Sequence, residues 1–89
     1  MPLSSSDKAS ILSLKKQILG YKAQIQTLKE QKKQRNLYYA GAIKSASTPA
    51  SKAQHKKAKL DAAAGYDRQI EARKDQIESA KSRIAQIKN

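Results

Sequence analysis

The chain has 89 residues and a formal net charge of +12, with 19 lysines and arginines against seven aspartates and glutamates. Leucine and isoleucine are few, and valine and cysteine are absent, which excludes a thick core, disulfides, thiol catalysis and an enclosed catalytic pocket. No apolar run approaches the roughly 18 residues of a membrane span, and the first residues lack a secretory-signal pattern. We therefore expect one small domain over residues 1–89, in the cytoplasm or exported without a cleavable signal peptide.

The first predicted element is a helix over about residues 5–40, after a short flexible start at 1–4. Ser4 and Asp7 have the spacing of a helix-capping pair, although either serine between them would also serve as the cap. Apolar residues then recur with alternating gaps of three and four, which predicts one buried stripe, here called the seam. In this helix the seam consists of Ile11, Leu14, Ile18, Tyr21, Ile25 and Leu28.

Polar residues interrupt this seam before the predicted turn. Lys32 and Arg35 take the next two seam positions, and the stripe resumes at Tyr39. Gly41 is predicted to end the helix, because glycine tolerates the left-handed conformation that is common at helix ends. A turn is therefore expected at about 41–48.

A second helix is predicted over about residues 49–88. Thr48 followed by Pro49 is a typical helix start, since the hydroxyl caps the first turn and proline has no N–H to leave unpaired there. Strands are not expected, because no alternating apolar pattern exists. The seam of this helix consists of Ala63, Tyr66, Ile70, Arg73, Ile77, Ala80, Ile84 and Ile87.

Two helices of similar length joined by a short turn predict an all-α fold, an antiparallel two-helix hairpin. Folding the chain about residue 46 places Lys32 and Arg35 opposite Lys57 and Leu60. The hairpin is then apolar toward the chain ends and polar near the turn. We expect it to pack in a multi-helix, coiled-coil-like bundle.

Two further leucines widen the apolar stripe of the first helix. Leu12 and Leu19 lie seven residues apart and off the seam, which broadens the stripe to about 150°, more than one partner helix covers. The leading hypothesis is therefore a non-enzymatic assembly protein that binds another helical chain, in a hetero-complex or a homodimer. The predicted partner-binding residues are Ile11, Leu12, Leu14, Ile18, Leu19, Tyr21, Ile25, Ile70, Ile77, Ile84 and Ile87.

The basic residues concentrate in the middle of the chain. From Lys29 to Lys59 there are nine lysines and arginines and only one acid, Glu30. Such a region attracts anions, so the alternative hypothesis is a nucleic-acid-binding or packaging hairpin; a merely solvated lysine-rich surface remains open beside it. The predicted anion-binding residues are Lys29, Lys32, Lys33, Arg35, Lys52, Lys56, Lys57 and Lys59.

The triplet Tyr39-Ala40-Gly41 stands close to mid-chain between the two predicted helices. This arrangement resembles the small helical-hairpin partners of bacterial type VII secretion, which bend at a Trp-x-Gly triplet. The resemblance implies a bend at Tyr39 and Gly41, and pairing with the helical domain of an exported toxin. That family's export signal, Tyr followed four residues later by an acid, is not met, because Ile70 follows Tyr66 at that spacing. The resemblance therefore implies an accessory partner.

The remaining polar residues do not predict chemistry. His55 is the only histidine and is expected to be an exposed helical residue among lysines. Asp67, Glu71 and Asp75 are expected to form a solvated acidic strip. We therefore predict no enzyme activity, no cofactor, no metal and no small-molecule substrate. A membrane-surface helix is disfavoured, because the lysines are not arranged opposite a large apolar face.

Overall fold

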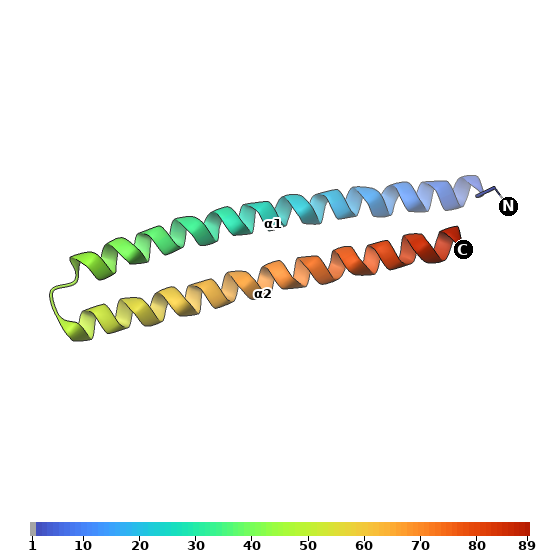
Figure 1. Ribbon diagram of the computed structural model, residues 1–89. Helices are drawn as coiled ribbons and strands as arrows, with labels where there is room; N and C mark the ends of the chain where they lie inside the picture. The colour runs from blue at the N-terminus through green and yellow to red at the C-terminus, as the bar shows by residue number, and fades with distance from the viewer. Residues whose placement is uncertain (1) are drawn as a thin grey trace. The chain divides into compact units, whose positions relative to one another are not determined.

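The computed structural model describes residues 2–89, so Met1, part of the expected flexible start, lies outside the described residues. Two helices account for nearly all of the chain: α1, Ser5–Ser45, has 41 residues and α2, Pro49–Lys88, has 40. No strand occurs between residues 2 and 89. The all-α antiparallel hairpin predicted from the sequence is confirmed (Figure 1).

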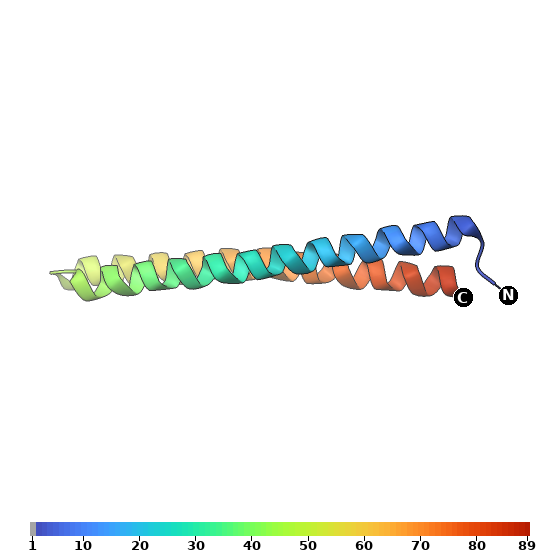
Figure 2. The same cartoon turned by 90° about the horizontal axis from the view of Figure 1, so that it is seen from above.

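The chain divides into two compact units, each built from one segment of α1 and one segment of α2. The terminal unit contains the described residues up to Ile25 together with Glu71–Asn89, and the turn unit contains Gln26–Ile70. Within each unit the two segments run side by side in Figure 1, and in Figure 2, seen from above, the α1 segment of the turn unit passes in front of the α2 segment. Each unit is therefore a pair of antiparallel helical segments.

The two helix starts are capped as the sequence predicts. At the start of α1, the Ser4 Oγ accepts a hydrogen bond from the backbone N–H of Asp7 at 3.0 Å, which identifies Ser4 rather than a later serine as the cap. At the start of α2, the Thr48 Oγ1 accepts a hydrogen bond from the backbone N–H of Ser51 at 3.1 Å. Each cap pairs one of the N–H groups that have no partner within the helix.

Removal of the Thr48 cap is expected to destabilise the turn unit measurably. Thr48→Ala should lower the free energy of unfolding by about 1 kcal/mol, the usual cost of losing a hydroxyl cap, as measured by urea unfolding followed by circular dichroism. Ser47→Ala is the matched control, because Ser47 is the exposed neighbour and is not the cap. Equal effects of the two substitutions would contradict the capping role.

The end of α1 differs from the prediction. The helix does not stop near residue 40 but continues through Gly41 to Ser45, which leaves a connection of only three residues, 46–48. No glycine has a positive φ in the described chain, so Tyr39 and Gly41 belong to the helix and the expected bend at these residues is wrong. A single helical glycine costs only about 1 kcal/mol, and Ala40, Ala42 and Lys44 around it favour the helix.

The register of the two helices also differs from the prediction. Lys32 does not lie opposite Lys57 and Leu60; in the turn unit its Nζ contacts Asp67 Oδ1 at 2.7 Å. Asp67 is seven residues beyond Leu60, a shift of one heptad. The longer α1 explains two of these residues, because the connection is centred on residue 47 rather than 46 and each facing partner moves by twice that difference. The long Lys32 side chain reaches further along α2 to Asp67.

The buried apolar side chains lie mainly in the terminal unit, as the sequence predicts. Ile11, Leu14, Ile18 and Ile25 of α1 are buried there, together with Ile77 and Ala80 of α2. The turn unit has only two buried side chains, Leu28 and Ile70. Burying each large aliphatic side chain contributes roughly 1.5–3 kcal/mol, so the apolar contribution to stability comes chiefly from the terminal unit.

The seam of the turn unit is mostly half-buried and polar. Lys32 keeps its predicted seam position, but the next one is taken by Asn36, while Arg35 is exposed. His55 of α2 is half-buried in the seam rather than an exposed histidine, because its position follows the helical spacing of Ser51 and Lys59. A seam of this kind has few apolar contacts and depends on polar pairs for its register.

Candidate interaction surfaces

Most of the residues predicted to bind a partner are occupied within the chain. Among the eleven residues, only Leu12 and Leu19 remain largely exposed. The half-buried residues are Tyr21, Ile84 and Ile87. The buried residues are Ile11, Leu14, Ile18, Ile25, Ile70 and Ile77.

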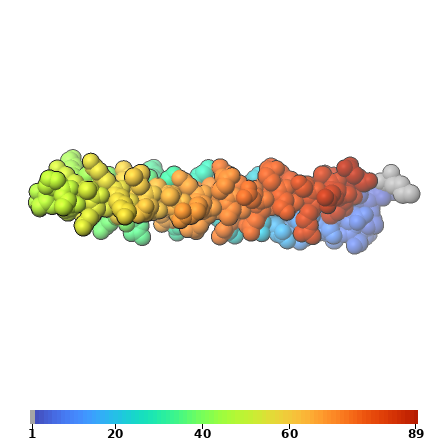
Figure 3. Space-filling model, turned by 90° about the horizontal axis from the view of Figure 1, so that it is seen from below, coloured from blue at the N-terminus to red at the C-terminus, as the bar shows by residue number. Residues whose placement is uncertain are grey.

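Leu12 and Leu19 form the outer leucine face, an apolar surface of α1 in the terminal unit. Leu12 is 55% exposed and Leu19 is 65% exposed, so the α2 segment does not cover them. Figure 3 shows one side of this unit, where the α2 segment lies over the α1 segment and leaves part of it visible beside it. At two helical turns apart, the two leucines project from the same side of α1.

A small hollow extends the outer leucine face toward the start of the chain. It is lined by three apolar side chains, Leu3, Ile11 and Leu12, and by Lys8, Lys15 and Lys88. The aliphatic stems of such lysines cover apolar surface while the ammonium groups stay in water. The apolar surface around Leu12 is therefore larger than the leucine side chain alone.

The predicted anion-binding residues divide by exposure. Lys32 and Lys59 are half-buried, and Lys32 is paired with Asp67. A single pair of this kind at the surface adds little to stability, but it links α1 and α2 within the turn unit. The exposed ones are Lys29, Lys33, Arg35, Lys52, Lys56 and Lys57.

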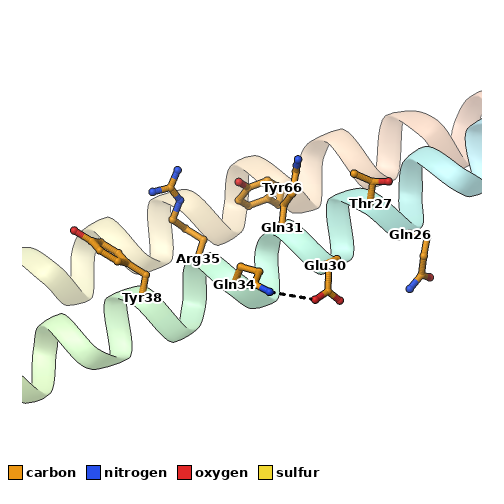
Figure 4. Close-up of a pocket in the computed structure, with 8 residues that line it drawn as sticks. All are labelled: Gln26, Thr27, Glu30, Gln31, Gln34, Arg35, Tyr38 and Tyr66. Carbon is orange, nitrogen blue, oxygen red and sulfur yellow. Dashed lines mark hydrogen bonds between the residues drawn. The ribbon is translucent and has the colours of Figure 1, made fainter.

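A polar groove on the turn unit was not predicted from the sequence. Its lining comes almost entirely from α1, and one tyrosine from α2, Tyr66, lies beside it (Figure 4). Within it, the Gln34 Nε2 donates a hydrogen bond to Glu30 Oε1 at 3.4 Å. The seam pattern does not reveal this groove, because glutamine-rich outer positions have no apolar periodicity. The lining residues are Gln26, Thr27, Glu30, Gln31, Gln34, Arg35, Tyr38 and Tyr66.

The groove presents hydrogen-bonding side chains. Its glutamine side chains and the Arg35 guanidinium project from α1 (Figure 4), and these residues are exposed. Tyr38 packs edge-on against Tyr39, with ring centroids 5.3 Å apart and an interplanar angle of 75°, so its ring is held by an intrachain contact.

No group of three or more histidine, cysteine or acidic side chains comes together to hold a metal ion among residues 2–89. Within the same part of the chain, no helix has the length and apolar character that crossing a membrane requires.

Comparison with known protein families, curated proteins and solved structures finds no match to this chain.

Proposed function

We propose that the protein is a non-enzymatic assembly protein whose terminal unit binds another helical protein through the outer leucine face. The proposal depends on one observation: Leu12 and Leu19 stay 55% and 65% exposed after α2 has covered the seam. Two large leucines on the same side of one helix are the anchors that a partner helix packs against.

The magnitude of the burial supports a partner. Covering a leucine side chain fully contributes roughly 1.5–3 kcal/mol, and the hollow beside Leu12 adds further apolar surface. The terminal unit also has only six buried side chains to offset its loss of conformational entropy. Association through the outer leucine face would therefore stabilise both the complex and the fold.

The resemblance to type VII secretion partners suggests which chain the face would bind. If that resemblance holds, the partner is the helical domain of an exported toxin, and this protein is its accessory or targeting subunit. A second copy of the chain is the other candidate, since two hairpins joined through α1 would form a four-helix bundle.

Replacing both exposed leucines is expected to weaken association while leaving the hairpin folded. The Leu12→Ser/Leu19→Ser double variant should raise the dissociation constant of the complex at least tenfold, because the apolar anchors are lost. The measurement is sedimentation equilibrium over a micromolar concentration series, with circular dichroism to confirm helix content. For a hetero-complex, the same variant is compared with the natural chain in nuclease-treated pull-downs from native lysate.

The matched control is Leu37→Ser/Leu60→Ser, which removes two comparably exposed leucines from the turn unit. This variant should associate as the natural chain does. A stable, fully helical monomer of the natural chain at micromolar concentration, with no partner lost in the double variant, would contradict the proposal.

A further inference from the structure

The two helices of the turn unit have the same pattern on their outer surface. In each helix, two lysines and a leucine follow one another at intervals of four residues, which places them on one side of the helix. The pattern consists of Lys29, Lys33 and Leu37 in α1, and of Lys52, Lys56 and Leu60 in α2.

Both patterns emerge on the same face of the turn unit. In α1, Leu37 directly follows the seam residue Asn36, and in α2, Leu60 directly follows the seam residue Lys59. Each of the four lysines also directly follows a seam residue. In chain order, these seam residues are Leu28, Lys32, Ser51 and His55. Two antiparallel helices are related by a two-fold axis perpendicular to the plane that contains them. Residues that directly follow a seam residue in either helix therefore lie on the same face of the pair.

The register brings the two leucines to the same level. Leu37 is five residues from Lys32 toward the turn, and Leu60 is seven residues from Asp67 in the same direction. The ion pair between Lys32 and Asp67 and the three-residue connection between Ser45 and Pro49 both place the leucines within about 5 Å of one level, at 1.5 Å per residue. The local two-fold axis therefore passes close to this leucine pair.

The resulting leucine–lysine face combines exposed apolar side chains with a concentrated positive charge. Leu37 and Leu60 are 63% and 70% exposed. All four lysines of the pattern are exposed. One acid, Asp67, also lies on this face, because it directly follows the seam residue Tyr66. Its carboxylate is paired with Lys32. The leucine–lysine face thus has unneutralised lysines on both sides of a leucine pair.

We infer that the leucine–lysine face docks on the surface of an anionic lipid bilayer. Lipid headgroups provide the negative charge that attracts lysines, and the acyl region below them accepts leucine side chains. The lysine stems reach along the apolar surface while their ammonium groups stay among the headgroups. This binding is peripheral. It differs from the single membrane-surface helix that the sequence disfavours, because it requires the two helices together and neither helix alone presents both leucines.

Other partners account for only part of the leucine–lysine face. A nucleic-acid backbone would attract the four lysines but would leave Leu37 and Leu60 without an apolar environment. A third helix laid between α1 and α2 would meet one apolar layer, the leucine pair, with lysines above and below it. A helix there would have a single apolar contact, whereas the outer leucine face offers leucines in two successive heptads.

The test uses the full chain and extruded vesicles that contain either phosphatidylcholine alone or phosphatidylcholine with phosphatidylserine. Co-sedimentation should show binding to the serine-containing vesicles, weakening as salt is raised, and little binding to phosphatidylcholine alone. Lys33→Gln/Lys56→Gln should reduce the partition coefficient about tenfold or more, since each lysine near such a surface contributes about fivefold. Leu37→Asn/Leu60→Asn should reduce it by a similar factor.

Matched controls separate the leucine–lysine face from charge and apolarity in general. Arg35→Gln/Lys57→Gln removes the same charge from exposed residues outside the pattern, and Leu12→Asn/Leu19→Asn removes the outer leucine face. Both controls should bind vesicles nearly as the natural chain does. Because the second control tests the surface of the proposed function, loss of association and loss of vesicle binding are distinguishable.

Several outcomes would overturn the inference. One is absence of binding to the serine-containing vesicles at low salt. Another is an equal loss of binding in the face variants and in their controls, with helix content unchanged by circular dichroism. A third is salt-dependent binding of a duplex DNA probe that Leu37→Asn/Leu60→Asn leaves intact while no vesicle is bound, which would assign the lysines to nucleic acid.

Discussion

Replacing Leu14 by alanine is expected to lower the free energy of unfolding by about 2–4 kcal/mol, the usual cost of truncating a buried leucine. Leu14 is only 5% exposed, one of the most completely buried residues of the chain. Because the molecule has so few buried aliphatic side chains, a loss of this size is a large fraction of the stability of a small domain. Thermal and urea unfolding followed by circular dichroism measure it.

Leu19→Ala is the matched control for Leu14→Ala. It removes the same atoms from the same helix, but its side chain is exposed, so the cost should stay below about 0.5 kcal/mol when the chain is monomeric. Both variants are compared at one low protein concentration, since association through Leu19 would add to its effect. Equal losses would contradict the assignment of the seam.

Replacing all three glycines by alanine is expected to raise the free energy of unfolding by about 2–3 kcal/mol, since each helical Gly→Ala change is worth about 0.8–1 kcal/mol. Gly20, Gly41 and Gly65 all lie inside helices, and an added Cβ would meet nothing within 4 Å at any of them. Alanine also restricts the unfolded chain. Chemical unfolding of the triple variant measures the gain.

Among the three glycines, Gly41 tests where α1 ends. A glycine that ends a helix in the left-handed conformation is destabilised by alanine, whereas a glycine inside a helix is stabilised. Ala40→Gly at the neighbouring exposed position is the reverse control and should cost about 1 kcal/mol. A loss of stability in the single variant Gly41→Ala would restore the bend that the sequence predicted there.

The outer leucine face and the leucine–lysine face belong to different units, and their chemistry differs accordingly. The first combines exposed leucines with a well-buried seam, which suits association with another helical protein. The second combines exposed leucines with unpaired lysines over a polar seam, which suits an anionic surface. An assembly protein with both surfaces would hold its protein partner close to a membrane.

Several features of this protein were accessible from the sequence because they depend on neighbours along the chain. The cap at Ser4, the restart at Thr48 and the seam from Ile11 to Leu28 all follow from local hydrogen bonding and helical periodicity. The exposure of Leu12 and Leu19 follows from the same periodicity. These features determine that the chain forms two helices and which side of each is buried.

The register and the end of α1 were decided by the tertiary structure. The seam of the turn unit contains lysine, asparagine, histidine and alanine, and such residues distinguish poorly between alignments that differ by one heptad. The pairing of Lys32 with Asp67, rather than with the neighbourhood of Leu60, could therefore not be read from periodicity. The leucine pair on the turn unit depends on that register, because two residues 23 positions apart in the chain lie at one level only when both helices are aligned.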